Sequence, residues 1–182
     1  AVLCKSANVA PPDSAATSTQ RGFKAACVFC PSTCPKGTKR MAAAVKLTNT
    51  EREVPLYIAE KDGKTFYVLP LRGTGLWGPI WGYMALESDG STIVGATFDH
   101  KGETPGLGAE IANADFQAQF AGKTIIDAGT FTSISVIKSG KSVNPQHEVD
   151  GISGGTITST GLHNMLGDCL QSYVGYFSKL KG

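Results

Sequence analysis

Residues 150–177 read DGISGGTITSTGLHNMLGDCLQSYVGYF. Past residue 161 the large apolar side chains recur at alternating steps of three and one, which is the spacing of a single stripe on an α-helix. The stripe consists of Leu162, Met165, Leu166, Cys169, Leu170, Tyr173, Val174 and Phe177. Because each fully buried large side chain contributes about 1.5–3 kcal/mol, we expect one long amphipathic helix packed on a sheet.

The strands of that sheet are expected upstream of the helix. VPLYIAE and KTFYVLP predict a hairpin over about residues 54–70 with Asp62-Gly63 as its turn. IWGYMALE and STIVGATF, joined by Ser88-Asp89-Gly90, predict a second hairpin. ADFQAQFAG at 114–122 predicts a short helix, and TFTSISVIK at 130–138 predicts a third strand region. The expected fold class is therefore α+β, a twisted and mostly antiparallel sheet with packed helices.

Length and charge divide the 182 residues into an arm and one domain. Residues 1–50 carry Pro, Ser, Thr and Cys without a sustained period, and we interpret them as an arm or linker before a domain at 51–182. The arm has seven Lys and Arg against one Asp, whereas the domain has ten against fourteen acidic residues. A mildly acidic domain does not indicate a nucleic-acid partner. No run of 18 apolar residues occurs, so nothing here is expected to span a bilayer by itself.

Three of the five cysteines lie close together in the arm, at Cys27, Cys30 and Cys34. Structural zinc and iron–sulfur clusters use four ligands, and Cys4 is a conceivable fourth. A metal-binding module in the arm therefore stays open beside free or disulfide-paired thiols. No metal site is expected in the domain.

The glycine-rich stretch at residues 73–78, GTGLWG, satisfies the pattern G-x-G-x-x-G, with Asp99 about twenty residues further on. A dinucleotide fingerprint must open a helix, but Pro79 and a strand-like run follow, so we reject that interpretation. The glycines instead permit close approach of the backbone to a planar ligand beside Leu76 and Trp77. The alternative is a glycine-rich turn with a core tryptophan.

A second unusual segment, GETPGLG, spans residues 102–108. Its proline and glycines predict a tight, stiff loop, with Glu103 and Thr104 as hydrogen-bonding side chains. His100, just before it, is interpreted as a surface residue and not as a ligand. Taken alone, this segment is equally compatible with an ordinary turn.

The third segment is DGISGGTITS at residues 150–159, directly before the predicted helix. A helix start offers unpaired N–H groups and the positive end of a macrodipole, which together suit a phosphate. The alternative is an ordinary capped N-terminus with Thr158 or Ser159 as the N-cap.

Taken together, GTGLWGPIWGYMAL, GETPGLGAEI, DGISGGTITS and the terminal helix resemble the covalent FMN-binding domain found in the C subunit of the sodium-translocating NADH:quinone oxidoreductase. The resemblance runs from about residue 51 to the end of the chain. In that family FMN is joined through its phosphate to the last Thr of a Ser/Thr-Gly-Ala-Thr signature. The attachment residue falls on Thr156, and Gly155 stands where the family has Ala.

The resemblance implies a flavin site assembled from all three segments. The cofactor-binding residues that it implies are Thr156, Ser153, Gly154, Gly155, Ile157, Thr158, Gly75, Leu76, Trp77, Glu103, Thr104, Gly106, Leu107 and Gly108. The implied role is that of an electron carrier with no catalytic residue and no turnover of its own.

The same resemblance implies a cellular context. It implies membrane partner subunits, a flavin transferase for maturation, and a flavin domain on the periplasmic face of a bacterial inner membrane. The family's N-terminal transmembrane helix is not present, so the chain is expected to be a soluble fragment. The equivalent flavin subunit of the ion-translocating ferredoxin:NAD oxidoreductase, which shares the fold and the flavinylation signature, is the alternative.

Overall fold

The computed structural model describes residues 2–5, 8–10, 16–20, 23–27 and 53–180. Its strands are β1 Val2–Lys5, β2 Asn8–Ala10, β3 Ala16–Gln20, β4 Phe23–Cys27, β5 Glu53–Lys61, β6 Lys64–Thr74, β7 Pro79–Glu87, β8 Ile93–His100, β9 Ile126–Asp127, β10 Thr130–Phe131, β11 Ser135–Ile137 and β12 Glu148–Asp150. Its helices are the 3-10 helix η1 Gly108–Ala112, α2 Ala114–Ala118 and α3 Thr156–Leu180.

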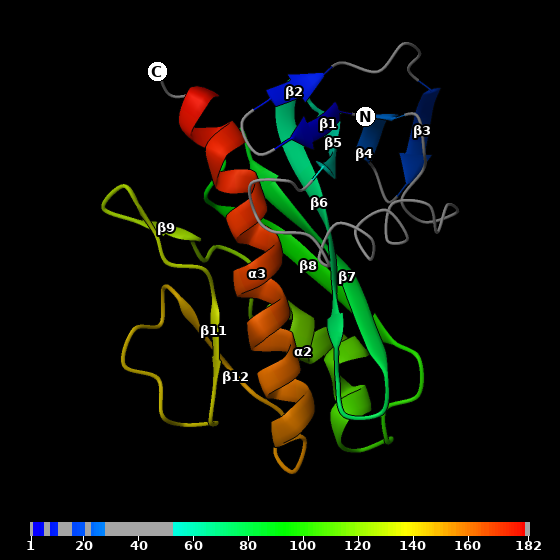
Figure 1. Ribbon diagram of the computed structural model, residues 1–182, viewed down its shortest axis with the longest axis vertical. Helices are drawn as coiled ribbons and strands as arrows, with labels where there is room; N and C mark the ends of the chain where they lie inside the picture. Colours follow the sequence, from blue (N-terminus) through cyan, green and yellow to red (C-terminus); the bar gives the residue numbers. More distant parts are fainter. Residues whose placement is uncertain (1, 6–7, 11–15, 21–22, 28–52, 181–182) are drawn as a thin grey trace.

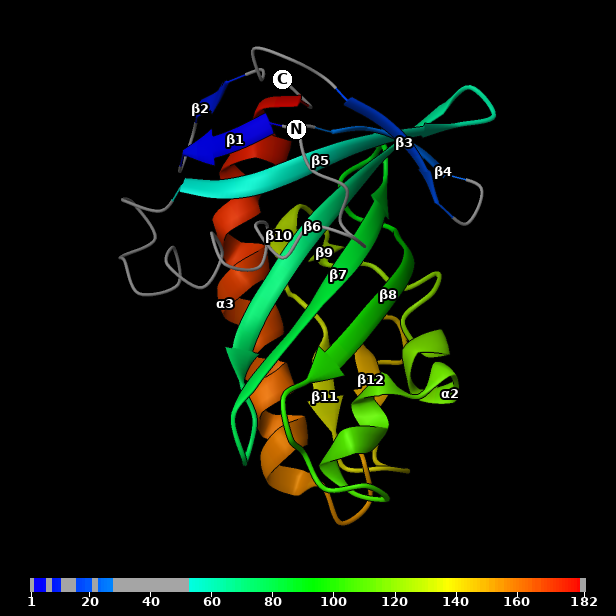
Figure 2. The same cartoon turned by 90° about the vertical axis from the view of Figure 1, so that its right-hand side faces the viewer.

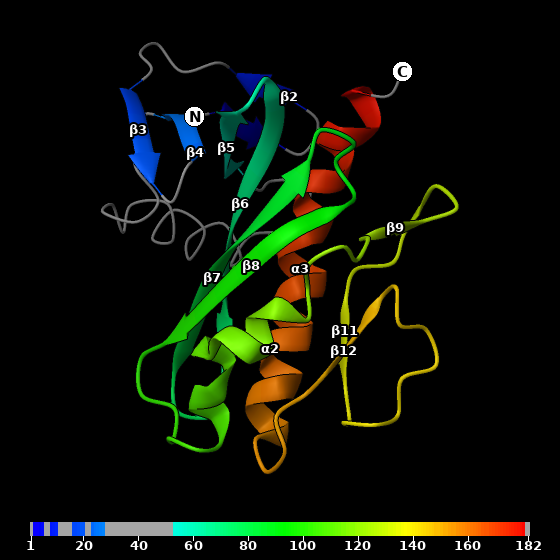
Figure 3. The ribbon, with the colours of Figure 1, turned by 180° about the vertical axis from the view of Figure 1, so that it is seen from behind.

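The main sheet has the strand order β2-β1-β5-β6-β7-β8, and the β3–β4 pair joins it through β5. Every pairing in this sheet is antiparallel. Helix α3 runs along one face of the sheet, as Figures 1 and 2 show from two sides. Figure 3 shows α2 beside β8, which is the last strand of the main sheet. The α+β prediction is confirmed.

Both predicted hairpins are present. Asp62 and Gly63 have φ of 52° and 74°, which is the left-handed backbone that a two-residue hairpin turn with right-handed strand twist requires. The turn between β7 and β8 is held by Asp89, whose Oδ1 accepts from the N–H groups of Ser91 at 2.8 Å and Thr92 at 2.9 Å. Short-range turn chemistry therefore fixes the register of both hairpins.

The G-x-G-x-x-G stretch forms the connection between two strands and does not lead into a helix. β6 ends at Thr74, the Gly75 N–H donates to the Gly78 carbonyl at 2.8 Å, and β7 begins at Pro79. A pyrophosphate would find no helix N-terminus here. The prediction that these glycines lead into a strand and do not open a helix is confirmed.

Helix α3 buries nearly the whole predicted stripe against the sheet. The stripe residues Leu162, Met165, Leu166, Cys169, Leu170, Tyr173 and Phe177 are buried. Tyr173 also donates its hydroxyl to the Pro55 carbonyl at 2.9 Å, which satisfies its one polar atom inside the core. The long amphipathic helix is confirmed.

The alternative N-cap, Thr158 or Ser159, is wrong by three to four residues, because Gly155 is the residue that precedes the helix. α3 begins at Thr156, and the first intrahelical bond runs from the Ser159 N–H to the Gly155 carbonyl at 2.9 Å. Thr158 and Ser159 therefore lie within the first turn. Their hydroxyls are used elsewhere, since the Ser159 Oγ accepts from the Ile152 N–H at 3.0 Å.

The third predicted strand region is divided in two. β10 pairs with β9, whereas β11 pairs in parallel with β12. Between them the N–H groups of Thr132 and Ser133 both donate to the Ile125 carbonyl, and Ser133 has a φ of 63°. Ser133, in the left-handed region of backbone conformation, interrupts the extended strand. The β-branched residues at 130–138 gave no indication of this break. The predicted helix at 114–122 is present but shorter, ending at Ala118.

The arm contributes strands that the linker interpretation did not anticipate. β1 pairs with β5 around Cys4 and Val54, and β4 pairs with β5 around Ala25 and Ala59. Of the suggested thiolate cluster, Cys30 and Cys34 lie outside the described residues. The domain boundary at residue 50 stays a prediction.

The described part of the chain has neither a membrane-spanning helix nor a metal-binding cluster of side chains. None of its helices combines the length and hydropathy needed to cross a membrane. Within the same residues, no group of three or more His, Cys, Asp and Glu side chains is arranged to hold a metal ion.

Candidate functional site

The three segments singled out in the sequence meet at one end of the molecule. Their meeting point is the carboxylate of Glu103, which is only 5% exposed. Its Oε1 accepts from the Trp77 N–H at 2.8 Å, and its Oε2 accepts from the Thr158 hydroxyl at 2.5 Å. Segments separated by 26 and 55 residues are thus joined through one side chain.

Close backbone contacts between the segments depend on glycine. A Cβ on Gly161 in α3 would overlap the Thr74 carbonyl oxygen at the end of β6. A Cβ on Gly108 would overlap the Thr158 hydroxyl, and one on Gly155 would lie 3.2 Å from the Gly108 nitrogen. The first two turns of α3 therefore rest directly on both glycine-rich loops.

The hydroxyl groups at the start of α3 fall into two classes. Those of Thr158 and Ser159 are buried and hydrogen-bonded inside the protein. Thr156 is exposed, and its hydroxyl forms no hydrogen bond with any of the described residues. Ser153 is exposed as well, but it precedes the helix.

The backbone around Thr156 is suited to an anion. The N–H groups of residues 156–158 come before the first intrahelical bond, and no acidic residue lies in the first turn. Gly154 has a φ of 77°, and a Cβ there would lie 2.7 Å from Leu107 Cδ2. Unpaired amides at the positive end of a 25-residue helix are a favourable environment for a phosphate.

Several large apolar side chains near this helix start are unusually exposed to solvent. The exposed fractions are 46% for Leu76, 66% for Trp77, 41% for Leu107 and 59% for Ile157. All four were site residues in the sequence prediction. Large exposed apolar side chains gathered in one place are typical of a binding surface.

The remaining site residues form the loop that carries Leu107. The Thr104 carbonyl accepts from the N–H groups of Leu107 and Ala109, both at 3.1 Å. Gly106 has a φ of 75° and donates its N–H to Glu110 Oε1 at 2.9 Å. His100, interpreted as a surface residue, is half-buried and accepts the Glu103 N–H at its Nδ1, 3.0 Å away, so it has a structural contact.

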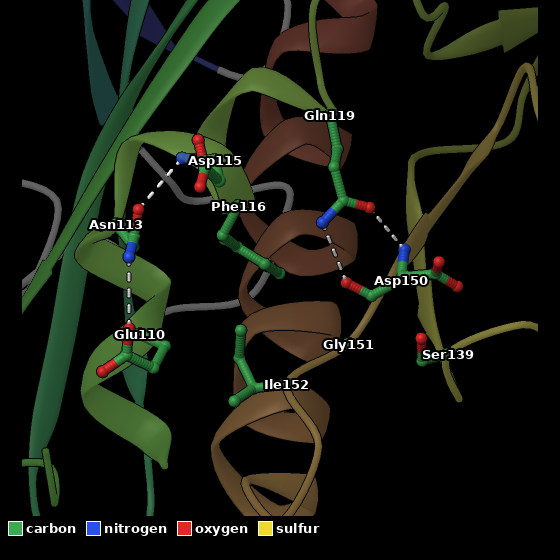
Figure 4. A pocket seen from close by; sticks show the side chains of 9 residues that line it. All are labelled: Glu110, Asn113, Asp115, Phe116, Gln119, Ser139, Asp150, Gly151 and Ile152. Carbon is green, nitrogen blue, oxygen red and sulfur yellow. Dashed lines mark hydrogen bonds between the residues drawn. The ribbon is translucent and has the colours of Figure 1, made fainter. Parts of the chain in front are cut away.

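Sequence reasoning missed a groove beside the helix start. The groove encloses about 400 Å³ and lies between α2 and the segment before α3 (Figure 4). Its lining residues are Glu110, Asn113, Asp115, Phe116, Gln119, Ser139, Asp150, Gly151 and Ile152. The Gln119 side chain donates to the Asp150 carbonyl at 3.3 Å and accepts its N–H at 2.8 Å, as Figure 4 shows. Glu110, Asp150, Gly151 and Ile152 lie within the quoted motifs, but no motif indicates that they line a groove with the other residues, because those come from separate segments.

A family model described as an FMN-binding domain matches residues 75–171, which is just over half of the chain. The chain belongs to the FMN-binding domain family. The match includes the first motif from Gly75 onward, the whole of the other two motifs and most of α3. FMN, the cofactor expected from the resemblance, is the one that the family description names.

Curated relatives carry the name expected from the motifs. The chain is 37% identical over 139 residues to the C subunit of the Na(+)-translocating NADH-quinone reductase of Vibrio vulnificus (strain YJ016), with 71% of this chain and 54% of the relative covered. It is 43% identical over 122 residues to the same subunit of Pseudomonas aeruginosa (PAO1), with 64% and 46% covered. The resemblance to this subunit is confirmed. The chain spans about half the length of the curated relatives it matches.

Two solved structures share the fold. The C subunit of the Na(+)-translocating NADH-quinone reductase from Parabacteroides distasonis ATCC 8503 superposes with a TM-score of 0.76 at 39% identity, covering 97% of this chain and 76% of that one. Shewanella oneidensis NqrC superposes with a TM-score of 0.67 at 23% identity, covering 99% and 82%, and supports the fold alone.

Proposed function

We propose that this chain carries FMN covalently, through a phosphoester to the Thr156 hydroxyl, and acts as an electron-carrier subunit of a sodium-translocating NADH:quinone oxidoreductase. The observation that carries the proposal is the position of Thr156. Its hydroxyl is exposed at a helix N-terminus, beside an exposed apolar surface, in a chain of the FMN-binding domain family.

The residues present fit the phosphate end of FMN. A phosphodiester retains one negative charge, which a helix N-terminus stabilises by about 0.3–1 kcal/mol at an exposed position. The N–H groups of residues 156–158 would hold this charge, and Gly154, with a φ of 77°, lets the backbone turn into the helix close to Leu107. Thr158 can offer only its N–H, because its hydroxyl is bonded to Glu103.

The residues present also fit the isoalloxazine end. Leu76, Trp77, Leu107 and Ile157 would cover the ring and keep water from part of it. The backbones of Gly75, Thr104, Gly106 and Gly108 would complete the walls. FMN supplies the one-electron chemistry, while the protein binds the ring, orients it and leaves an edge accessible to redox partners. No catalytic side chain is required for this role.

The names of the relatives support the wider context. In those bacteria the related protein is one subunit of a Na(+)-translocating NADH-quinone reductase. We infer that this chain works with membrane subunits of such a complex at the periplasmic face of the inner membrane, after a flavin transferase has attached the FMN. The names favour this complex over the equivalent flavin subunit of a ferredoxin:NAD oxidoreductase.

The test is attachment in Thr156→Ala, with Thr160→Ala as the matched control on the same helix. When each variant is produced with a flavin transferase, denatured wild type and Thr160→Ala should fluoresce under ultraviolet light and gain the mass of FMN. Thr156→Ala should do neither. If Thr156→Ala kept the fluorescence and Thr158→Ala lost it, the assignment would be wrong.

A further inference from the structure

The carboxylate of Glu103 is held by hydrogen bonds from two other segments of the chain. It is buried, and each of its oxygens accepts one hydrogen bond, Oε1 from Trp77 and Oε2 from Thr158. Both donors belong to segments that carry exposed residues of the proposed flavin site. The third segment is its own, since the loop from Glu103 leads directly to Leu107.

Two glycines form a slot around this carboxylate. A Cβ on Gly75 would lie 2.6 Å from Oε1, and a Cβ on Gly108 would lie 2.6 Å from Oε2. Contacts this short leave no space for a larger side chain on either side. The Glu103 carboxylate therefore fits here only because both neighbouring positions are glycine.

No cation neutralises Glu103 within the described residues. No Lys, Arg or His there forms an ion pair with it, and the nearby His100 ring accepts its backbone N–H. A buried carboxylate without a cationic partner depends on its hydrogen-bond donors, and losing one donor leaves an oxygen unsatisfied. The Trp77 N–H and the Thr158 hydroxyl are therefore coupled through Glu103.

We propose that Glu103 is a positioning residue: it fixes the Trp77 loop against the first turn of α3, so that the apolar wall and the Thr156 attachment point are preorganised. The effect on FMN rests on the proposed function. The coupling between the Trp77 loop and the first turn of α3 does not rest on the proposed function, because it involves only residues of this chain.

The coupling predicts different results from similar substitutions. Glu103→Gln keeps the shape, but its neutral amide oxygen accepts a weaker hydrogen bond from the Trp77 N–H than a carboxylate does. The amide can hold Thr158 only if the Thr158 hydroxyl changes from donor to acceptor. Thr158→Val removes the hydroxyl at nearly equal volume, whereas Thr158→Ser keeps it. A purely steric role for Glu103 would make Glu103→Gln silent.

The first measurement uses the 182-residue chain without FMN. Backbone amide exchange of Trp77, followed by NMR, should be about tenfold faster or more in Glu103→Gln and Glu103→Ala. The matched control is Glu110→Gln, because Glu110 bonds to Gly106 and Asn113 and not to Trp77 or Thr158. Unchanged Trp77 exchange in Glu103→Gln would overturn the coupling.

The second measurement uses protein loaded with FMN by a flavin transferase. Glu103→Gln and Thr158→Val should shift the visible circular dichroism and the reduction potential of the flavin, and Thr158→Ser should restore wild-type values. If both loaded variants matched wild type, the positioning role would be refuted while FMN binding stood. If wild type took up no FMN, the proposed function would fail, and the exchange data would still decide the coupling.

Discussion

Two glutamates hold different loops of this domain, and they do so in different ways. Glu103 is buried and joins segments 26 and 55 residues away. Glu148 lies at the surface, where its Oε2 accepts from the Ser142 hydroxyl at 2.9 Å and from the N–H groups of Val143 and Asn144, both at 2.8 Å. One carboxylate assembles distant parts of the chain, and the other closes a local loop.

The same contrast holds for exposed apolar side chains. Trp77 and Leu107 lie on segments that pack on other segments, whereas Val143, 88% exposed, lies at the tip of the loop that Glu148 closes. We therefore expect substitutions where the three segments meet around Glu103 to alter the stability, the flavin or both. Substitutions in the loop that Glu148 closes should have only local effects.

The largest effect is expected where α3 meets the tip of β6. Gly161→Ala should destabilise the protein by about 1–3 kcal/mol, because the new methyl group overlaps the Thr74 carbonyl oxygen. Gly167→Ala on the same helix should stabilise by about 0.5–1 kcal/mol, since nothing lies within 4 Å of its Cβ. Denaturant unfolding measures both, and equal effects from the two substitutions would contradict the close helix–loop contact.

A smaller effect, confined to the flavin, is expected at Trp77. Trp77→Ala should change the free energy of unfolding by less than about 1 kcal/mol, because the side chain is mostly exposed. In FMN-loaded protein it should shift the absorption and potential of the flavin without releasing it. Val143→Ala removes a still more exposed side chain and should leave the absorption and potential of the flavin unchanged. If Val143→Ala shifted them as much as Trp77→Ala does, the proposed position of the flavin beside Trp77 would be wrong.

The smallest and most local effect is expected at Glu148. The N–H of Asn144, the hydroxyl of Ser142 and the N–H of Val143 lower the pKa of Glu148 below its ordinary value. The stabilisation from the carboxylate is therefore complete above about pH 4.3, the ordinary glutamate value, and it is lost as the pH falls through the lowered pKa.

The amide chemical shifts of Val143 and Asn144 should accordingly titrate below the ordinary glutamate range. In Glu148→Gln the same amides should show no such titration, and the Trp77 amide should keep its wild-type shift. Movement of the Trp77 amide in step with Val143 would show that the two loops are coupled after all.

Much of the fold could be predicted because its signals are local. Asp62-Gly63 and Ser88-Asp89-Gly90 specify turns within four residues, and the apolar stripe of α3 follows from the helical period alone. The strand at 130–138 was predicted as continuous and is broken, because the break depends on bonds from Thr132 and Ser133 to Ile125, which no periodicity records.

The sequence by itself determined the two hairpins, the long helix, the rejection of a dinucleotide site and the three segments that meet at one end. Each of these depends on the conformation of neighbouring residues or on a recognisable motif. Only the tertiary structure decided that Thr158 and Ser159 are buried while Thr156 is exposed, and that Glu103 bonds to Trp77 and Thr158. The reason is physical: a hydroxyl or carboxylate has no preferred partner until the fold brings distant segments within about 3 Å, and that approach depends on the overlap-free packing of glycines such as Gly75, Gly108 and Gly161.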